Sequence, residues 1–248
     1  MTVDPLAGTP WIAPGTVAGF ATSPPNETLL RFAAHERQRV PDGRLIDIGC
    51  GAGRNAVPLA EQGWQVFGVD SSWPMLVAAA KRAQEADVSG RVGLARAPMD
   101  HLPLRDRGFD LVVAHGIWNL ARSSAEFRRA VEEAARVARP NAGLFVFTFS
   151  RHTLPADASP VVGEPFVFTQ FSGTPQCFLT RDQLLDELHA AGFGLDPAVP
   201  FTEHNLPRPG ALTTGRVPVI YEAAFRFIRA STPRSDPSAR RAARAGTS

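Results

Sequence analysis

The sequence predicts a doubly wound α/β domain with a seven-stranded, mostly parallel sheet and a terminal antiparallel strand. Two observations lead to this prediction. Five apolar segments alternate with helical patterns between residues 44 and 149, which is typical of parallel strands joined by helical crossovers. Two further strand-like stretches, at roughly 198–205 and 217–228, are separated by a short proline-containing loop that has no room for a helix. We therefore expect those two stretches to pair antiparallel.

The elements follow in order along the chain. Residues 1–24 are rich in Pro, Gly and Thr and are interpreted as an arm without regular structure. A helix is expected in SPPNETLLRFAAHERQ, residues 23–38, with Asn26 as its N-cap, and the turn 41–43 follows. Strands are then expected at 44–49, 65–70, 91–97, 109–115 and 144–149. The strand at 109–115 is apolar throughout, which predicts that both of its faces are covered.

Helices are expected between and after these strands, at roughly 55–63, 74–86, 124–138 and 181–192. Two of them begin with the pattern of a capping box: Ser123 with Glu126, and Thr180 with Gln183. Residues 151–178 contain four prolines and are predicted to be a long irregular loop. Residues 1–24 are therefore interpreted as an arm or lid, 25–230 as one domain, and 231–248 as a polar, disordered tail.

Composition excludes several classes of function. The chain has 248 residues, 44% hydrophobic and 20% charged, enough for one domain with a core of useful size. A net charge of +2 argues against nucleic acid as a partner. Two cysteines provide neither a disulfide framework nor a cysteine-only zinc site, and we expect no metal. No leader pattern and no apolar run of about 18 residues is visible, so a cytoplasmic protein without a membrane contact is expected.

The segment 45–60, LIDIGCGAGRNAVPLA, takes a predicted strand into a glycine cluster and then into a helix. This arrangement holds nucleotide-like ligands at the carboxyl end of a strand. Gly51, Gly53 and Ala56, with Asp70 further on, satisfy a loose dinucleotide pattern, so an NAD-dependent oxidoreductase is one interpretation. No Gly-Lys-Ser/Thr follows the glycines, which disfavours a nucleotide triphosphatase.

Three acidic residues favour a different ligand. Asp47 ends the first strand, where a carboxylate repels pyrophosphate but suits an ammonium group. Asp70 ends the second strand and can accept hydrogen bonds from both ribose hydroxyls. Asp100 follows the third strand and can accept from the adenine amine while Met99 packs on the ring. Ammonium, ribose and adenine in this order describe S-adenosylmethionine, although Asp47 and Asp70 could instead cap loop or helix amides.

These residues resemble the class I S-adenosylmethionine-dependent methyltransferases. The resemblance is carried by residues 45–70, by APMDHLPLRDRGFDLVVAHGIWNL at 97–120, and by RVARPNAGLFVFTFS at 136–150, and it extends over about 27–195. It implies a Rossmann-like fold and methyl transfer from S-adenosylmethionine to a small-molecule acceptor. The Gly-Arg-Asn at 53–55 is similar to the small-molecule, tellurite-resistance-like branch of the family.

The resemblance also implies a cofactor site. The glycines would shape the loop around the methionine part, and the backbone at His115 would meet the ammonium end. Cys50 is interpreted mainly as a small filler of the loop. The full set of expected cofactor contacts is Asp47, Gly49, Cys50, Gly51, Gly53, Asn55, Asp70, Ser71, Met75, Met99, Asp100, His101 and His115.

His115 and His152 are the candidate catalytic residues. They end the fourth and fifth predicted strands, at the edge where ligands bind, and imidazole can act as a general base near neutral pH. His152 is the stronger candidate because it begins the long loop, where an acceptor would enter. A non-catalytic S-adenosylmethionine-binding domain is the remaining alternative. We expect a monomer or homodimer; the acceptor, and the atom that is methylated, stay open at this point.

Overall fold

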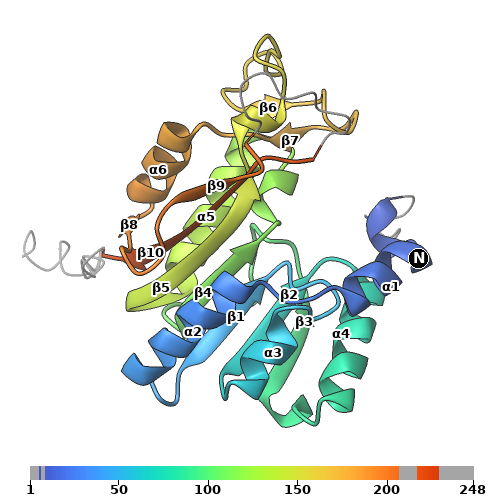
Figure 1. Ribbon diagram of the computed structural model, residues 1–248, viewed down its shortest axis with the longest axis vertical. Coiled ribbons are helices and arrows are strands. Elements are labelled where there is room, and N and C mark those ends of the chain that lie inside the picture. Colours follow the sequence, from blue (N-terminus) through green and yellow to red (C-terminus); the bar gives the residue numbers. More distant parts are fainter. Residues whose placement is uncertain (1–5, 7–8, 207–216, 229–248) are drawn as a thin grey trace, which may run out of the picture.

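The structure is a computed structural model that describes residues 6, 9–206 and 217–228 (Figure 1). Its centre is an eight-stranded sheet in the order β3-β2-β1-β4-β5-β10-β8, with the short β9 also paired to β10. The strands are β1 (Arg44–Ile48), β2 (Gln65–Asp70), β3 (Val92–Arg96), β4 (Phe109–His115), β5 (Ala138–Phe149), β8 (Phe193–Leu195), β9 (Thr202–His204) and β10 (Ile220–Phe227).

Strand directions confirm the predicted sheet. β1 to β5 are parallel, and β10 is antiparallel to β5, β8 and β9. The expected pairing of 198–205 with 217–228 is found as β9 with β10. β8 was not predicted, because three residues directly after the Gly192 turn are too few to show a period.

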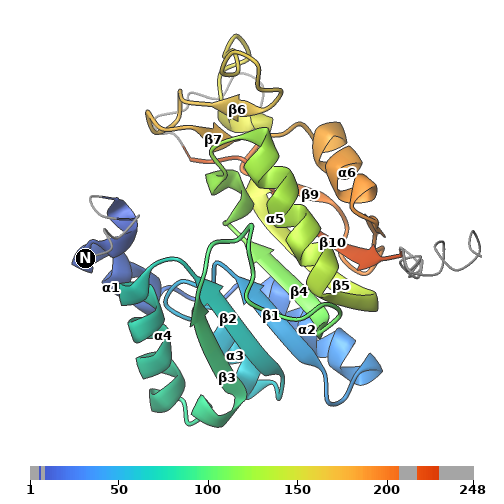
Figure 2. The ribbon, with the colours of Figure 1, turned by 180° about the vertical axis from the view of Figure 1, so that it is seen from behind.

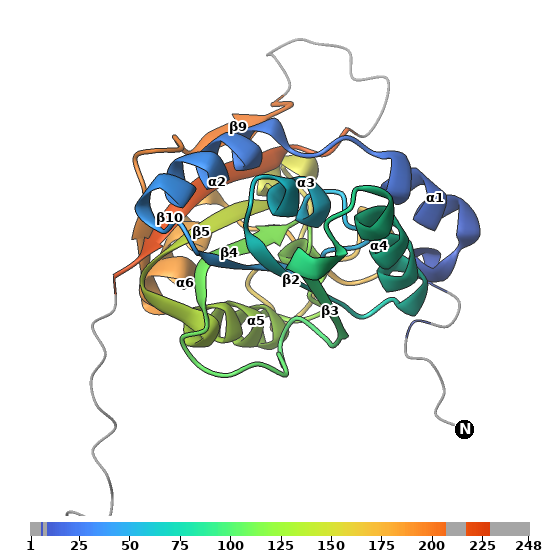
Figure 3. The ribbon, with the colours of Figure 1, turned by 90° about the horizontal axis from the view of Figure 1, so that it is seen from below.

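Helices cover both faces of the sheet. α2 (Glu27–Arg39), α3 (Ala56–Glu61) and α4 (Trp73–Glu85) lie on one face, and α5 (Ser124–Val137) and α6 (Arg181–Ala190) on the other, as Figure 3 shows. Figure 2 displays the face that carries α5 and α6. β4 is buried along its length up to His115, which confirms the prediction of a strand covered on both sides.

The amino-terminal arm contains regular structure, so that part of the prediction was wrong. A 3-10 turn (η1, Pro10–Ile12) leads into α1 (Pro14–Thr22), and α1 packs against α4. Pro14 occupies the first turn of α1, where a missing N–H costs nothing. The helix is rich in glycine and alanine and lacks an apolar stripe, so the sequence pattern did not reveal it.

Residues 151–178, predicted to be a long irregular loop, are mostly irregular but form a cap that contains three short regular elements. A 3-10 turn (η4, Arg151–Thr153) opens the cap, and β6 (Val167–Phe168) pairs antiparallel with β7 (Gln176–Cys177). The Arg151 guanidinium donates to four carbonyl oxygens of the cap and lies over the Phe168 ring. The cap stands beyond the carboxyl end of β5, at the top of Figure 1.

Local details correct other predictions. Ser123 caps α5, but the Glu126 carboxylate accepts from the Arg122 N–H instead of closing the predicted capping box. The box of Thr180 with Gln183 is present. β5 begins at Ala138, earlier than expected, and passes through Asn141 at φ +65°. The predicted tail, 231–248, lies outside the described residues. No helix in the described ranges is long and apolar enough to cross a membrane.

Candidate cofactor and acceptor site

Asp47 is the most unusual group at the carboxyl edge of the sheet. Its side chain is 1% exposed, and its Oδ2 has no hydrogen-bond partner among the described residues. Burial raises the pKa of Asp47 to about 7; Arg54 opposes this rise and Asp70 adds to it. A buried acceptor without a partner is costly, so this carboxylate fits a cationic ligand group better than a structural role.

The three glycines after β1 all have positive φ, but their surroundings differ. A Cβ on Gly49 would lie 2.7 Å from the Ile117 side chain, and one on Gly53 would lie 3.2 Å from Ala79. Those two positions therefore serve close packing. A Cβ on Gly51 would meet only Phe20 at 3.7 Å and Met75 at 4.0 Å. Gly51 therefore offers backbone that a ligand can approach.

Asp70 connects the glycine loop to the start of α4. Its Oδ2 accepts from the Gly51 N–H at 2.9 Å and its Oδ1 from the Ser72 N–H at 2.7 Å. Burial raises the pKa of Asp70, and these backbone hydrogen bonds partly offset the rise. The capping role is thus present. Each oxygen retains a lone pair, so a ribose hydroxyl can still be accepted.

His115 lies between two polar partners at the end of β4. Arg54 Nη2 is 2.9 Å from His115 Nδ1, and Asn26 Nδ2 is 3.3 Å from Nε2. The ring also stacks on Phe147, with centroids 4.1 Å apart. Burial, and then Arg54, lower the pKa of His115 to about 3, so the imidazole is neutral. Because a guanidinium only donates, it occupies the Nδ1 lone pair, which argues against His115 as a base.

The polar contacts continue from Asn26 to the far strands. Asn26 Nδ2 donates to Glu222 Oε2 at 2.7 Å, while its Oδ1 caps α2 through the Leu29 N–H. The buried Glu222 also lies 3.3 Å from His204 Nε2. This network connects the glycine loop with β9 and β10, which are far apart in the sequence.

The adenine side of the predicted site differs from expectation in one respect. Met99 is buried, as a residue packing on a ring would be. Asp100 Oδ2 accepts from Arg129 Nε and Nη2 at 3.1 and 3.0 Å, so this oxygen is engaged by α5. His101 is exposed. The hydrogen bond between Asp100 and the adenine amine therefore stays a prediction, and Oδ1 would have to accept it.

The remaining predicted contacts connect the glycine loop and the start of α4 to neighbouring elements or are buried beside them. The Cys50 thiol is buried against β2, and burial raises its pKa. Asn55 Oδ1 accepts from the Asn26 N–H at 3.0 Å and so connects the loop to α2. Ser71 donates to the Ala97 carbonyl, and Met75 is buried in the first turn of α4.

The described part of the arm lies on the cofactor side. Phe20 approaches Gly51, as noted, and Ser72 Oγ donates to the Trp11 carbonyl at 2.8 Å. Arg82 Nη1 donates to the Ala21 carbonyl at 3.1 Å. These contacts place the described part of the arm beside the glycine loop and α4.

His152 lies in η4, at the start of the cap. Its side chain is 61% exposed, and Nδ1 lies 2.7 Å from Glu203 Oε1. Ser150 Oγ donates to the same carboxylate oxygen. His152 and His115 therefore have different partners and different chemistry.

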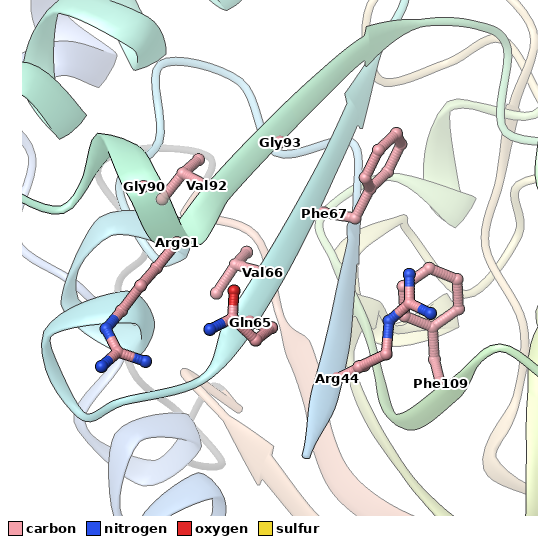
Figure 4. A pocket seen from close by; sticks show the side chains of 9 residues that line it. All are labelled: Arg44, Gln65, Val66, Phe67, Gly90, Arg91, Val92, Gly93 and Phe109. Atoms are coloured by element: carbon pink, nitrogen blue, oxygen red, sulfur yellow. The ribbon is translucent and has the colours of Figure 1, made fainter. Parts of the chain in front are cut away.

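A hollow of about 460 Å³ lies elsewhere, at the amino ends of the strands (Figure 4). Arg44, Gln65 and Phe109 line it, and each is the first residue of its strand. In open α/β sheets ligands bind at the opposite edge, where the glycine loop is, so we do not assign the cofactor here. Within the described ranges no group of three His, Cys, Asp or Glu side chains is placed to hold a metal.

Sequence reasoning missed several members of the site. Arg54, Phe20 and Gly116 were not selected, although Gly116 has φ +70° and open space where a Cβ would be. Glu203 and Glu222 were also missed. An acidic residue inside the apolar strand VIYEAAF was the available indication for Glu222.

Comparisons with known proteins identify the family of the chain. Residues 45–141 match the family model described as a methyltransferase domain. A ubiquinone/menaquinone biosynthesis C-methyltransferase UbiE of Syntrophotalea carbinolica is 34% identical over 169 residues, 61% of this chain and 68% of that protein. A ubiquinone biosynthesis O-methyltransferase of Azorhizobium caulinodans is 32% identical over 153 residues, 60% of this chain and 58% of that protein.

A solved structure shows the same fold. The 1,6-didemethyltoxoflavin-N1-methyltransferase of Burkholderia thailandensis, with bound 1,6-didemethyltoxoflavin and S-adenosylhomocysteine, has a TM-score of 0.58 and 19% identity. The match covers 82% of this chain and 80% of that one. The chain belongs to the class I S-adenosylmethionine-dependent methyltransferases. It is therefore a methyltransferase that uses S-adenosylmethionine, and the NAD-dependent interpretation is wrong.

Proposed function

We propose that this methyltransferase acts in the cytoplasm, holds S-adenosylmethionine at the carboxyl edge of β1, β2 and β4, and methylates a small molecule. The buried, unpartnered Oδ2 of Asp47 carries the first part of this proposal. The relatives named for ubiquinone and menaquinone biosynthesis support a small-molecule acceptor, as does the near-neutral charge of the chain. The tellurite-resistance-like branch stays a prediction.

The residues of the site fit this cofactor. Asp47 would face its ammonium group, Gly51 and the open backbone at Gly116 would lie along it, and Asp70 would accept from the ribose. Met99 would pack on the adenine. When bound, the cofactor supplies a methyl group that its sulfonium already activates for displacement. The protein therefore mainly orients the acceptor and manages its proton.

On the acceptor side we assign the general base to His152. It lies beside the cap, is exposed, and has a carboxylate at Nδ1, whereas the Nδ1 lone pair of His115 faces Arg54. The acceptor would enter beneath the cap formed by residues 151–178. We expect a monomer or homodimer that binds neither nucleic acid nor membrane.

Methyl transfer to a panel of small acceptors tests this function. The panel contains 4-nitrocatechol, 1,4-dihydroxy-2-naphthoate, benzylamine and benzenethiol, with S-adenosylmethionine as donor. We expect turnover of at least one compound, and a loss of about 10²-fold in kcat for His152→Ala, the contribution of a general base. His115→Ala should lose less. S-adenosylhomocysteine affinity should be unchanged in His152→Ala.

Full turnover in both histidine variants would contradict the base assignment and favour an acceptor that needs no deprotonation. Binding of S-adenosylhomocysteine without methylation of any acceptor would favour the non-catalytic interpretation.

A further inference from the structure

His152 and Glu203 form a pair built from two separate elements. His152 is the middle residue of η4, and Glu203 is the middle residue of β9. Glu203 Oε1 lies 2.7 Å from His152 Nδ1 and also accepts from the Ser150 hydroxyl. Glu203 is not part of the cofactor site described above, and no sequence motif indicates it.

The strand β10 and Val219, directly before it, hold both partners in place. Glu203 is opposite Tyr221 in the ladder of β9 and β10. On the other side, the Ser150 N–H donates to the Val219 carbonyl at 2.8 Å, and the Thr153 hydroxyl donates to that carbonyl at 2.9 Å. The His152 N–H in turn donates to Ser150 Oγ at 3.1 Å. The pair is therefore fixed by the backbone on both sides.

This geometry selects one tautomer of His152. A carboxylate oxygen only accepts, so Nδ1 must carry a proton, and in the neutral ring Nε2 then keeps the lone pair. No described group hydrogen-bonds to Nε2, and the ring is mostly exposed. His115 differs, since its two ring nitrogens both face donors, Arg54 at Nδ1 and Asn26 Nδ2 at Nε2, so its partners select no tautomer.

We infer that Glu203 is a positioning residue, and that the acceptor is a hydroxyl compound such as a phenol. The inference rests on the proposed function. The hydroxyl proton passes to Nε2 of His152 while the acceptor oxygen forms its bond to the methyl carbon. The electron pair of the broken carbon–sulfur bond stays on sulfur. An acceptor that carries its own lone pair without a proton to lose would not need this pair.

The charged groups around His152 and Glu203 are compatible with His152 acting as a general base. Arg151, on the same turn, is engaged by carbonyl oxygens of the cap. Tyr221 faces Glu203 from β10, and burial raises its pKa, so it stays neutral. Arg181, at the start of α6, lies over the Phe201 ring. Glu203 is thus the charged group that contacts the imidazole directly.

Nitrogen NMR of the imidazoles tests the tautomer without cofactor or acceptor. The full chain, labelled with ¹⁵N-histidine, is studied at alkaline pH, and the His152 signals are assigned by their loss in His152→Gln. We expect a protonated Nδ1 and an unprotonated Nε2 in the wild type. In Glu203→Ala the proton should shift toward Nε2. A wild-type ring protonated at Nε2, or a tautomer unchanged in Glu203→Ala, would overturn the inference even if methyl transfer is observed.

Kinetics supply the second readout. With 4-nitrocatechol as acceptor, Glu203→Gln should lower kcat about tenfold or more, part of a base's contribution, and leave KM for S-adenosylmethionine unchanged. Glu132→Gln, an exposed glutamate of α5, is the matched control and should behave as wild type. Equal kcat in Glu203→Gln and Glu132→Gln, or turnover restricted to benzylamine and benzenethiol, would contradict the inference.

Discussion

At the residue scale, the glycines after β1 have separate roles. Gly49 and Gly53 give room to Ile117 and Ala79, so larger residues there would disturb packing. Gly51 faces open space and is the one whose substitution should act mainly on the ligand. The glycine pattern is visible in the sequence, but this division of roles is not, because it depends on neighbours 26 to 68 residues away.

Asp47→Asn should stabilise the ligand-free protein and remove cofactor binding. The pKa of about 7 in the folded protein lies above the ordinary aspartate value of 3.8, so the folded state binds the proton more tightly. Burial of the ionised Asp47 carboxylate therefore costs no stability below pH 3.8. The cost grows as pH rises from 3.8 to about 7 and is complete above that pH. We expect Asp47→Asn to gain on the order of 1–3 kcal/mol at pH 8 and little at pH 4.

Urea denaturation of both proteins at the two pH values measures this difference. A destabilised Asp47→Asn protein at pH 8 would show that Asp47 has a structural partner and is not reserved for a ligand.

Asp70→Ala should weaken both the fold and cofactor binding. The carboxylate also accepts from Gly51 and Ser72, and hydrogen bonds to charged groups contribute about 1.5–3 kcal/mol each. We expect a loss of affinity of roughly ten- to several-hundred-fold, from the same principle, together with a lower Tm. Calorimetry measures the cofactor affinity, and thermal unfolding measures the stability of the fold. Unchanged affinity would show that Asp70 is not part of the cofactor site.

Residues whose chemistry is evident from position alone could be predicted. Asp47 and Asp70 end strands, so their place at one edge followed from the topology. Arg54, Glu222 and Glu203 could not be predicted in the same way. Their partners, His115, Asn26 and His152, come from other elements, and only the folded sheet brings them together.

At the element scale, the arm should contribute to cofactor affinity. Phe20 lies against Gly51, and the arm is hydrogen-bonded to Ser72 and Arg82. Phe20→Ala should therefore weaken S-adenosylhomocysteine binding several-fold, by loss of a buried contact of about 1 kcal/mol. Val162→Ala, fully exposed on the cap, is the control. Unchanged affinity combined with lower turnover would restore the arm as a lid over the acceptor.

Elements with a clear period or caps were predicted well, whereas those held by tertiary contacts were not. The strands β1, β2 and β4 and the helix α2 appear close to their expected bounds. α1 is held by α4, and the cap by Arg151 and a cluster of phenylalanines. Neither α1 nor the cap has an apolar period clear enough to indicate regular structure in a segment rich in proline and glycine.

At the scale of the whole molecule, a buried ion network fastens α2 to the far strands, away from the site. Glu36 is fully buried, and its carboxylate accepts from Arg226 of β10 and from Arg39. Burial alone would raise its pKa, but these two arginines lower it overall. The stabilisation is therefore present above the ordinary pKa of a glutamate and is lost as pH falls through the lowered value.

Glu36→Gln should destabilise the protein by about 3 kcal/mol near neutral pH, as removal of one partner of a buried pair does. S-adenosylhomocysteine affinity should stay at the wild-type value. Denaturation curves and calorimetry on the same preparation check both, with Glu132→Gln as control. A large loss of affinity would mean that this network is coupled to the site.

Thermal unfolding with S-adenosylhomocysteine or NAD tests the central claim most directly, namely that Asp47 and the glycine loop hold the cofactor. A ligand at about 100 times its Kd contributes roughly 2.7 kcal/mol, which raises Tm by about 5–10 °C in a chain of this size. We predict this rise for the wild type with S-adenosylhomocysteine, none with NAD, and none for Asp47→Asn with either. A rise with NAD alone, or an undiminished rise in Asp47→Asn, would contradict the account.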